Sequence, residues 1–523
     1  MADWLNIAEI VRVNAQKYRG QIALSDERRR FTFAQVDERI SRLARGLMKL
    51  GLKKGDRVAI LLENCIEICE AYFAAARAGF VAVPVSFRYT PADTEYVINH
   101  SDARALIVHD EFVPLTEDIR PRLKKIGKTG FICVRSSPDS AIPKGYREYE
   151  AFLLAQKPAD PGVKILPKDI WIQLYTSGTT GRPKGVLRTH ESYTAFYLIN
   201  GVDFGFSEHD VVLNVMPLYH VNATFFSFSV TYVGGRIHIF PARNFQAVGL
   251  LDAIDRHKIT FVSLIPTHYN LILALPEEVK RQYDVSSINK LLCSSAPARS
   301  ETKKGVLQFF PGAQLFEGYG STEAGIVTTL KPYEQLTKLG SIGKESCGTD
   351  TIKVLDAKRR PVKPGEIGEL FSRGPMMFSG YYKAPDLTKK QFEGEYFSAG
   401  DMARQDDDGY YYLVDRKHNM IITGGEHVFP SEVEEVLCCH PGVFEAAVVG
   451  LPHVKWGEEV TAVVICKDGV CLDENAIVVH CRDRLASFKT PKKVIFVSND
   501  EMPRTPTGKI LHRVLRERFG KSG

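Results

Sequence analysis

Residues 175–185 are the part of the chain whose residue types point most directly to chemistry. The segment combines glycines, hydroxyls and cations, namely Gly178, Gly181, Gly185, Thr176, Ser177, Thr179, Thr180, Arg182 and Lys184. Glycines let backbone amides approach phosphate oxygens closely, and hydroxyls and a lysine add further donors. The spacing of a Walker loop is absent, so phosphate would be held by a different kind of loop. An ordinary surface turn is the alternative interpretation.

This segment resembles the phosphate-binding signature of the acyl-adenylate-forming superfamily. That family contains acyl-CoA synthetases, non-ribosomal adenylation domains and firefly-type luciferases. Other segments similar to its signatures follow in the family's order, from Phe31–Phe33 to Lys509, so the resemblance covers nearly the whole chain. It is strongest to AMP-forming CoA ligases of the fatty-acid or carnitine type. The resemblance implies an acid–thiol ligase that uses ATP, Mg²⁺ and coenzyme A.

The resemblance implies that residues 317–323 contact the nucleotide. Tyr319 would stack on adenine, Thr322 would lie near the α-phosphate, and Glu323 would hold Mg²⁺, because a hard cation prefers a carboxylate. Taken alone, the segment is more typical of a turn after a strand with a solvated glutamate. The implied nucleotide-binding set also includes Glu317, Gly318, Gly320 and Ser321, the loop residues named above from Thr176 to Gly181 with Lys184, and Ala296 and Pro297 against the other adenine face.

Asp401 and Arg416 resemble two further positions of the family. Asp401 would accept hydrogen bonds from both ribose hydroxyls, although Ala399 stands where the family usually has threonine. Arg416 would contact ribose or the α-phosphate. His418 stands where most relatives carry aspartate or lysine as the pivot of a hinge between two domains.

Two glycines and a lysine complete the implied site. Gly424 and Gly425 would line the entry for the pantetheine arm of coenzyme A, and a structural Gly-Gly turn explains them equally well. Lys509 follows a Pro- and Gly-containing segment and is similar to the family's catalytic lysine. A cation there would bridge the attacking carboxylate and the α-phosphate in the transition state. An exposed lysine is the alternative.

The acid is indicated by fewer residues. His220, within the segment 216–223, would orient the substrate carboxylate, and a packed core histidine is the alternative. Acetate-using relatives carry tryptophan where this chain has Gly320, so we expect a longer acid. A medium- to long-chain aliphatic or carnitine-like acid is favoured, and an aryl acid stays open. Downstream aromatic residues would line the pocket or form core, namely Phe225, Phe226, Phe228 and Tyr232.

These residues need a scaffold, and the hydrophobic pattern predicts an α/β fold. Short apolar runs alternate with helical patterns, which is typical of helix-covered parallel sheets. After about residue 401 the pattern changes to that of a small α+β domain. We therefore expect a large N-terminal domain over residues 1–415 with the acyl and ATP sites, and a small mobile C-terminal domain over residues 416–523. Strands are expected at 57–62, 80–85, 105–108, 171–174, 260–264, 290–294 and 314–316.

Composition excludes several other classes of protein. The chain has 523 residues, 44% of them hydrophobic and 25% charged, with a formal net charge of +6. The charge is small for this length and dispersed, so we expect no nucleic-acid partner. No apolar stretch approaches the length of a spanning helix, and the ten cysteines contain no C-x-x-C pair. A cytoplasmic enzyme with reduced thiols is expected, and a homodimer is left open.

Three rival activities remain. A stand-alone adenylation enzyme would load a carrier-protein thiol and give no product with free coenzyme A. A non-catalytic relative would bind ATP without releasing pyrophosphate, and the presence of Lys509, Glu323, Asp401 and Arg416 argues against it. A luciferase-type oxidase would emit light with a luciferin.

Replacing the implied catalytic lysine separates the two half-reactions. Lys509→Ala should abolish acyl-adenylate formation, because the charge on the attacking carboxylate and the α-phosphate loses its bridging cation. Thioester formation from supplied acyl-AMP should be largely spared. Pyrophosphate release and thioester mass measure the two steps, and equal loss in both would reject the role of Lys509.

Overall fold

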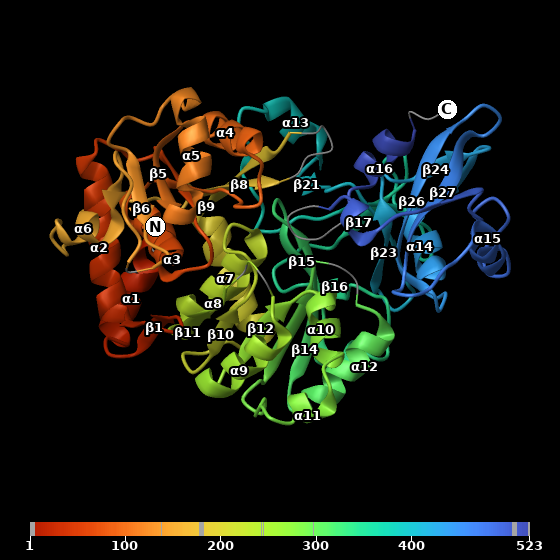
Figure 1. Ribbon diagram of the computed structural model, residues 1–523, viewed down its shortest axis with the longest axis horizontal. Coiled ribbons are helices and arrows are strands. Elements are labelled where there is room, and N and C mark those ends of the chain that lie inside the picture. The colour runs from red at the N-terminus through yellow and green to blue at the C-terminus, as the bar shows by residue number, and fades with distance from the viewer. Residues whose placement is uncertain are drawn as a thin grey trace. The chain divides into compact units, whose positions relative to one another are not determined.

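The computed structural model divides into two compact units (Figure 1). Unit 1 comprises residues 1–352 and 372–397, and unit 2 comprises residues 353–371 and 398–523. The structure describes residues 6–137, 139–176, 182–241, 243, 245–295, 298–504 and 510–520.

The first sheet of unit 1 has eight strands in the order β19-β9-β8-β4-β3-β5-β6-β7. Strands β3 to β8 run parallel where they pair, and β9 and β19 add antiparallel pairs at one edge. The strands are β3 (Arg57–Leu61), β4 (Val81–Pro84), β5 (Ala103–His109), β6 (Phe131–Val134), β7 (Arg147–Glu148), β8 (Ile170–Thr176), β9 (Lys184–Thr189) and β19 (Gly380–Tyr381).

The second sheet of unit 1 has nine strands in the order β16-β15-β14-β13-β12-β10-β11-β1-β2. Its central strands pair in parallel, and each edge ends in antiparallel pairs. The strands are β1 (Ile22–Ser25), β2 (Arg30–Thr32), β10 (Val211–Asn214), β11 (Arg236–Ile239), β12 (Phe261–Leu264), β13 (Lys290–Ser294), β14 (Gln314–Ser321), β15 (Gly325–Leu330) and β16 (Lys344–Glu345).

Helices cover both sheets of unit 1. The α-helices are α1 (Ala8–Lys17), α2 (Phe33–Lys49), α3 (Ile66–Ala78), α4 (Pro91–His100), α5 (Val113–Ile119), α6 (Tyr149–Leu154), α7 (His190–Phe204), α8 (Val221–Val233), α9 (Ala247–His257), α10 (Pro266–Leu273), α11 (Glu277–Lys280), α12 (Ser300–Phe309) and α13 (Pro385–Lys390). Short 3-10 helices span Asp110–Phe112, Arg120–Arg122 and Pro332–Glu334, and a small hairpin joins β20 (Phe392–Glu393) to β21 (Tyr396–Phe397).

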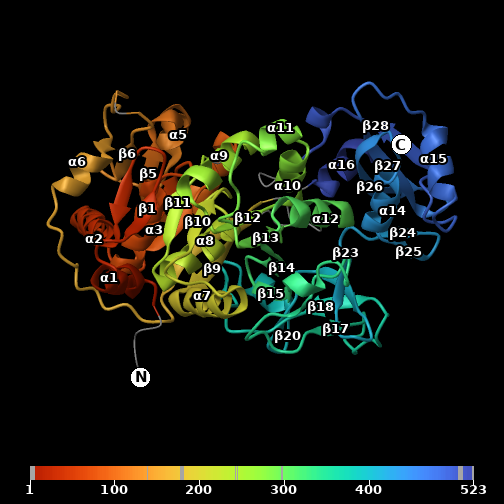
Figure 2. The ribbon, with the colours of Figure 1, turned by 90° about the horizontal axis from the view of Figure 1, so that it is seen from below.

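The helices of the second sheet are divided between its two faces (Figure 2). Val212 and Leu292 belong to the core shared with α7 and α8, while their neighbours Leu213 and Leu291 belong to the core shared with α9, α10 and α12. Side chains alternate across a strand, so each strand of a sheet covered on both faces must be apolar throughout. This explains why these strands appear in the sequence as continuous apolar runs.

Helices α3 and α8 lie in the core that the two sheets share. Every residue of α3 is buried, and α8 is buried from Val221 to Thr231. Trp171 of β8 packs edge-on against Tyr72 of α3, at 6.2 Å between ring centroids, and lies 6.3 Å from Phe228 of α8. A helix that is buried on all sides needs core packing on each of its faces.

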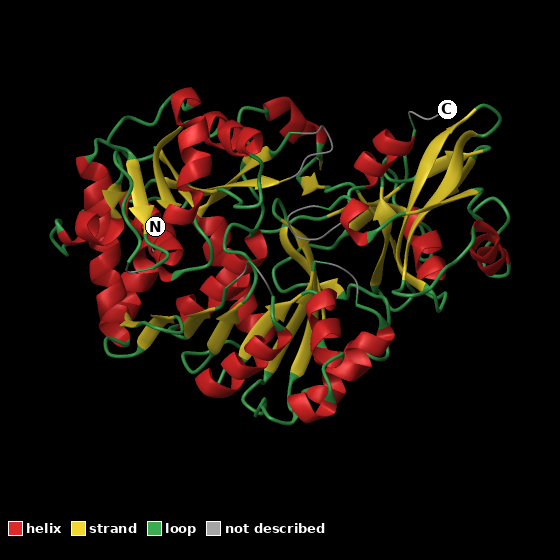
Figure 3. Cartoon of the chain, in the orientation of Figure 1, coloured by secondary structure: helices red, strands yellow, loops and turns green. Residues whose placement is uncertain are grey.

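Unit 2 contains two antiparallel-rich sheets (Figure 3). The first pairs β17 (Lys353–Leu355), β18 (Gly368–Phe371), β22 (Asp401–Gln405) and β23 (Tyr411–Arg416). The second combines β24 (Ile421–Thr423), β25 (Glu426–Val428), β26 (Val443–His453), β27 (Gly457–Cys466) and β28 (Lys493–Phe496) with helices α14 (Pro430–Cys438), α15 (Glu474–Arg482) and α16 (His512–Phe519) and a 3-10 turn at Asn499–Glu501. Helices α14 and α15 pack on one face of it and α16 on the other.

The predicted fold class is confirmed: a large N-terminal part with helix-covered sheets precedes a smaller C-terminal part. The strand predicted at residues 314–316 was too short. Strand β14 runs to Ser321 because antiparallel β15 pairs with it as far as Ser321, so Tyr319 lies within the strand. The domain boundary at residues 415 and 416 concerns a hinge and stays a prediction. Among the described residues, no helix is both long and apolar enough to cross a bilayer.

Truncation of Phe228 tests the shared core. Phe228 is fully buried, with its ring centroid 4.8 Å from that of Phe73, so Phe228→Ala should cost about 3–5 kcal/mol through lost burial and a cavity. Calorimetric thermal unfolding measures this as a lower midpoint. The control Val202→Ala removes a side chain of a residue that is 72% exposed and should change stability by less than about 0.5 kcal/mol. Equal shifts in the two variants would contradict this account of the core.

Candidate active site

The predicted phosphate loop connects two antiparallel strands. Thr176 ends β8 and Lys184 begins β9, and these two residues pair directly in the register. Residues 177–181, which include Ser177, Gly178, Thr179, Thr180 and Gly181, lie outside the described residues. The two ends of the loop are therefore held side by side, which is the geometry of a hairpin connection.

Lys184, Tyr381 and Glu323 form a cluster at the end of this loop, where β9 begins. The Tyr381 hydroxyl donates to Oε1 of Glu323 at 2.8 Å, and Nζ of Lys184 lies 5.3 Å from the centroid of the Tyr381 ring. Burial lowers the pKa of Lys184, and the charge of Glu323 opposes this effect. Burial and the Glu323 carboxylate both raise the pKa of Tyr381, so this hydroxyl remains a donor at neutral pH. The Lys184 ammonium and the Glu323 carboxylate thus lie in one half-buried cluster.

The strand order explains why Tyr381 lies in this cluster. Tyr381 lies on β19, whose register pairs it with Val186 of β9 and so places it near Lys184. The backbone amide of Phe378 also donates to the Glu323 carbonyl, at 2.7 Å. Sequence reasoning missed Tyr381, because a tyrosine after a glycine carries no motif that would single it out.

Arg188 is a second residue that sequence reasoning missed. It is fully buried, and its Nη1 donates to the Thr322 carbonyl at 2.7 Å. The guanidinium lies over the rings of Tyr193 and Phe225, 5.2 and 4.9 Å from their centroids. Burial lowers the pKa of Arg188 to about 10, so it remains a cation at neutral pH. Within the described part of the chain, its Nε and Nη2 atoms have no hydrogen-bond partner.

The other residues of the nucleotide motif lie on β14. Glu317 forms an ion pair with buried Lys303 at 2.5 Å and accepts a bond from the Ala298 amide at 3.3 Å. Burial raises the pKa of Glu317, and Lys303 opposes this rise. Gly318 pairs with Thr329 of β15, and Ser321 Oγ accepts from the Ala324 amide at 3.0 Å.

The neighbouring backbone of β15 requires glycine at position 320. The register of β14 and β15 shifts between Tyr319 and Gly320, and a Cβ at Gly320 would lie 2.0 Å from the carbonyl oxygen of Gly325. No side chain fits there unless the backbone moves. This requirement is independent of the length of the acid.

His220 lies at the carboxyl ends of parallel strands, where open α/β sheets bind ligands. It is the N-cap residue of α8, and its Nδ1 accepts from the Asn222 amide at 3.3 Å. The Asn222 side chain in turn donates to Ser294 Oγ at 2.7 Å and accepts from Ser263 Oγ at 3.1 Å. These bonds join the ends of β12 and β13 to the His220 segment and fix the orientation of the imidazole.

The segment after β13 carries an unusual backbone conformation. Ser295 has a φ of +70°, which costs energy for a residue with a Cβ, and such residues cluster at binding sites. Ala296 and Pro297, predicted to contact adenine, follow it and lie outside the described residues. The predicted pocket residues Phe225, Phe226 and Phe228 are buried in the shared core of unit 1.

Asp401 and Arg416 are paired within unit 2. They face each other across β22 and β23, and Nε of Arg416 lies 2.5 Å from Oδ1 of Asp401. Arg416 is exposed while Asp401 is buried, and Nη1 of Arg416 also donates to the Ala399 carbonyl at 3.4 Å. The two residues predicted to contact ribose and phosphate therefore belong to one local cluster.

The remaining predicted residues of unit 2 lie in turns. Gly424 and Gly425 connect β24 to β25 with φ of +61° and +87°, which suits glycine in a tight hairpin. His418 is exposed between β23 and β24. Lys509 lies outside the described residues, and the segment that contains it is closed by a bridge between Arg504 and Ile510.

Two family models match the chain. The AMP-binding enzyme model matches residues 11–382, and the AMP-binding enzyme C-terminal domain model matches residues 432–509. The chain belongs to the AMP-binding enzyme family. The first match alone covers more than half of the sequence and contains the loop, the Lys184–Tyr381–Glu323 cluster and His220.

Relatives of this AMP-binding enzyme align with it over nearly the whole length of both chains. Feruloyl-CoA synthase from Amycolatopsis sp is 34% identical over 492 residues, which is 94% of each chain. Long-chain-fatty-acid–CoA ligase FadD13 from Mycobacterium tuberculosis is 33% identical over 496 residues, covering 94% of this chain and 93% of that one. The crystal structure of anthranilate CoA ligase AuaEII with anthranoyl-AMP superposes with a TM-score of 0.87 at 29% identity, covering 99% and 98% of the two chains. The predicted class, an AMP-forming acid–thiol ligase, is confirmed.

Removal of the Tyr381 hydroxyl tests the role of the cluster. Tyr381→Phe deletes a hydrogen bond to a carboxylate, which is worth about 1.5–3 kcal/mol. We expect pyrophosphate release to need roughly tenfold more Mg²⁺ for half-maximal rate, because Glu323 is less well oriented. The neighbouring variant Tyr382→Phe, which deletes a 2.8 Å bond to Asp102, serves as the matched control. A Mg²⁺ dependence that is unchanged in Tyr381→Phe would contradict the prediction.

Proposed function

We propose that this enzyme converts a carboxylic acid to its coenzyme A thioester in two half-reactions. In the first, the carboxylate attacks the α-phosphorus of ATP, which gives acyl-AMP and pyrophosphate. In the second, the thiolate of coenzyme A attacks the acyl carbonyl, and AMP leaves. The observation that carries the proposal is the cluster of Lys184, Tyr381 and Glu323 at the base of the predicted phosphate loop, within a chain of the AMP-binding enzyme family.

Glu323 fits the Mg²⁺ ion that such a reaction needs. A carboxylate oxygen is the ligand type that Mg²⁺ prefers, and the hydrogen bond from Tyr381 holds this carboxylate in one orientation. When bound with ATP, the ion would neutralise phosphate charge as pyrophosphate departs. Thr322, held through its carbonyl by Arg188, would stay close to the α-phosphate.

The other residues act mainly by positioning and by charge. The substrate carboxylate is already ionised, so the first step needs little acid–base help. The donors of the loop from Thr176 to Gly181 and Lys184 would hold the leaving phosphates. Tyr319 would pack on adenine and Asp401 would accept from ribose. His220 would orient the acid through Nε2, since Nδ1 caps α8. Lys509 would stabilise the charge that develops in the transition state.

The second step requires a different arrangement of the same chain. We propose that the C-terminal domain over residues 416–523 moves relative to residues 1–415, with the pivot near His418. Gly424 and Gly425 would then admit the pantetheine arm, and Lys509 would leave the reaction centre. Movement of a small domain lets one active site serve two reactions in turn. Arg416 would remain near the nucleotide through its pairing with Asp401.

The acid itself is the finer part of the proposal. We favour a medium- to long-chain aliphatic or carnitine-like acid, which the sequence around His220 supports and which agrees with the long-chain ligase among the relatives. An aryl acid is the second candidate, because feruloyl-CoA synthase is 34% identical, against 33% for the long-chain ligase, and anthranilate CoA ligase shares the fold. Because the Gly325 carbonyl excludes a side chain at Gly320, glycine at this position does not indicate the length of the acid.

A cytoplasmic setting with free coenzyme A as acceptor completes the proposal. All ten cysteines are free thiols, including exposed Cys347, Cys439 and Cys471, which agrees with a reducing compartment. The alternative acceptor is the phosphopantetheine thiol of a carrier protein.

A substrate panel tests the proposed function. Pyrophosphate release is measured with acetate, octanoate, palmitate, ferulate, anthranilate and carnitine, each with and without coenzyme A. We expect the highest kcat/KM for octanoate, palmitate or carnitine, and thioester mass only when coenzyme A is present. Preference for ferulate or anthranilate would reject the aliphatic assignment. Pyrophosphate release without any thioester would reject free coenzyme A as the acceptor.

A further inference from the structure

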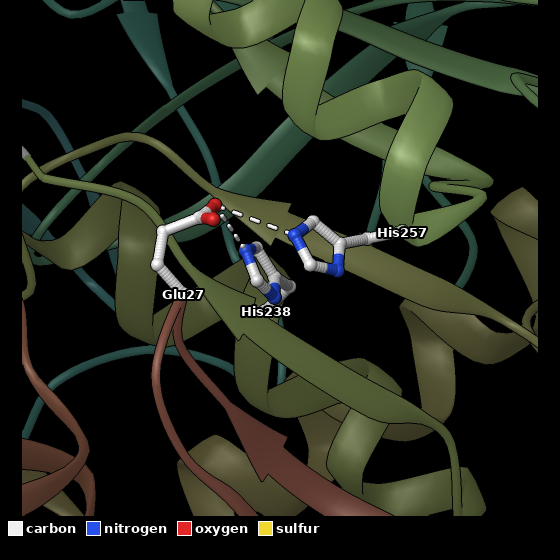
Figure 4. Close-up of side chains that lie close together, drawn as sticks. All are labelled: Glu27, His238 and His257. Carbon is white, nitrogen blue, oxygen red and sulfur yellow. Dashed lines mark hydrogen bonds and ion pairs between the residues drawn. The ribbon is translucent and has the colours of Figure 1, made fainter.

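Three side chains from distant parts of the sequence converge beside the outer strands of the nine-stranded sheet. Glu27 lies in the turn between β1 and β2, His238 lies on β11, and His257 is the last residue of α9. Figure 4 shows both imidazole rings directed at the Glu27 carboxylate. All three belong to unit 1 and are separate from the Lys184–Tyr381–Glu323 cluster. Carboxylate and imidazole groups in this combination are common ligands of transition metals.

The spacing of the ligand atoms matches a tetrahedral metal centre. Nε2 of His238 and Nε2 of His257 lie 3.4 and 3.3 Å from the same oxygen, Oε1 of Glu27. In a tetrahedral site with bonds of about 2.1 Å, neighbouring ligand atoms lie about 3.4 Å apart. One potential ligand atom from each residue lies within 4.8 Å of the other two.

The tautomer of His238 with its proton on Nδ1 leaves Nε2 available as a metal ligand. Ser25 Oγ lies 3.0 Å from Nδ1 of His238 and donates to the Ile237 carbonyl at 3.5 Å, so Nδ1 can donate its own proton to Ser25. In the tautomer with the proton on Nδ1, the Nε2 lone pair faces Oε1 of Glu27, and a cation between these two atoms would remove their repulsion.

Further contacts hold the ligands in place. Arg256 forms an ion pair with the other carboxylate oxygen, Oε2, so Oε1 is turned toward the histidines. Asp252 lies 2.9 Å from Arg256 and offsets its positive charge. Nη2 of Arg236 donates to the His257 carbonyl at 2.5 Å and fixes the end of α9. Metal ligands are commonly oriented by such outer contacts.

We propose that Glu27, His238 and His257 bind one transition-metal ion of the Zn²⁺ type, with water as the fourth ligand. Imidazole ligands favour Zn²⁺ or Co²⁺ over Mg²⁺, so the site differs in chemistry from Glu323. The ion is structural: it ties the β1–β2 turn to β11 and α9, and its binding raises the thermal stability of the folded chain. The adenylation chemistry does not depend on it.

The experiment uses the full chain without an affinity tag, stripped with a chelator and then titrated with ZnCl₂ or CoCl₂ in the absence of nucleotide. The test variants are Glu27→Gln and His257→Gln. The matched control is His209→Gln, because exposed His209 lines the same surface hollow as His257 without joining the cluster. Isothermal titration, visible absorption of bound Co²⁺ and the thermal midpoint are measured for each protein.

The proposal expects one metal ion per chain and a raised thermal midpoint in the wild type and in His209→Gln. Both test variants should bind at least tenfold more weakly and lose most of the thermal shift, while their pyrophosphate release stays at the wild-type rate. Equal affinity in the test variants would overturn the proposal, as would absence of binding to the wild type. A thiolate charge-transfer band from Co²⁺ would also overturn it, because the ligands would then be cysteines.

Discussion

The candidate active site of unit 1 depends on how the dipeptide Thr322–Glu323 is held between two sheets. The dipeptide follows β14 of the nine-stranded sheet, yet its contacts come from the edge of the eight-stranded sheet. Arg188 of β9 binds the Thr322 carbonyl, and Tyr381 of β19 binds the Glu323 carboxylate. The phosphate loop ends where β9 begins, at Lys184. The same strand therefore positions the predicted phosphate donors and the predicted metal ligand relative to each other.

The cost of this arrangement lies in Arg188. A fully buried guanidinium loses its hydration, which is expensive unless other groups replace the water. One hydrogen bond to a carbonyl and contacts with two aromatic faces replace part of the lost hydration. The remaining loss of hydration lowers the pKa of Arg188. Removal of Arg188 would leave the Thr322 carbonyl without this bond. A costly buried cation at this position is consistent with a requirement for rigid placement of the adjacent carboxylate.

Two clusters among the described residues of unit 1, one proposed to hold Mg²⁺ and one proposed to hold a transition metal, differ in chemistry. At Glu323 a carboxylate is oriented by a tyrosine hydroxyl and lies near a lysine, which suits a hard ion that arrives with phosphate. At Glu27 a carboxylate faces two imidazoles, which suits a borderline ion held by the protein alone. The first cluster joins the two sheets near the predicted nucleotide. The second joins the turn between the edge strands β1 and β2 to β11 of the same sheet and to α9.

The sequence by itself determined the family, the reaction class and the alternation of strands and helices. Glycines and hydroxyls in the loop, and continuous apolar runs in strands covered on both faces, are local properties that need no tertiary information. Only the tertiary structure revealed Tyr381, Arg188 and the Glu27–His238–His257 cluster, because their partners lie 58, 134 and more than 200 residues away. It also decided that Gly320 is required by a bulge, since the Gly325 carbonyl that excludes a side chain arrives through the pairing of β14 with β15. Contacts of this kind arise from strand order and register, and the spacing of residues within a motif predicts neither of them.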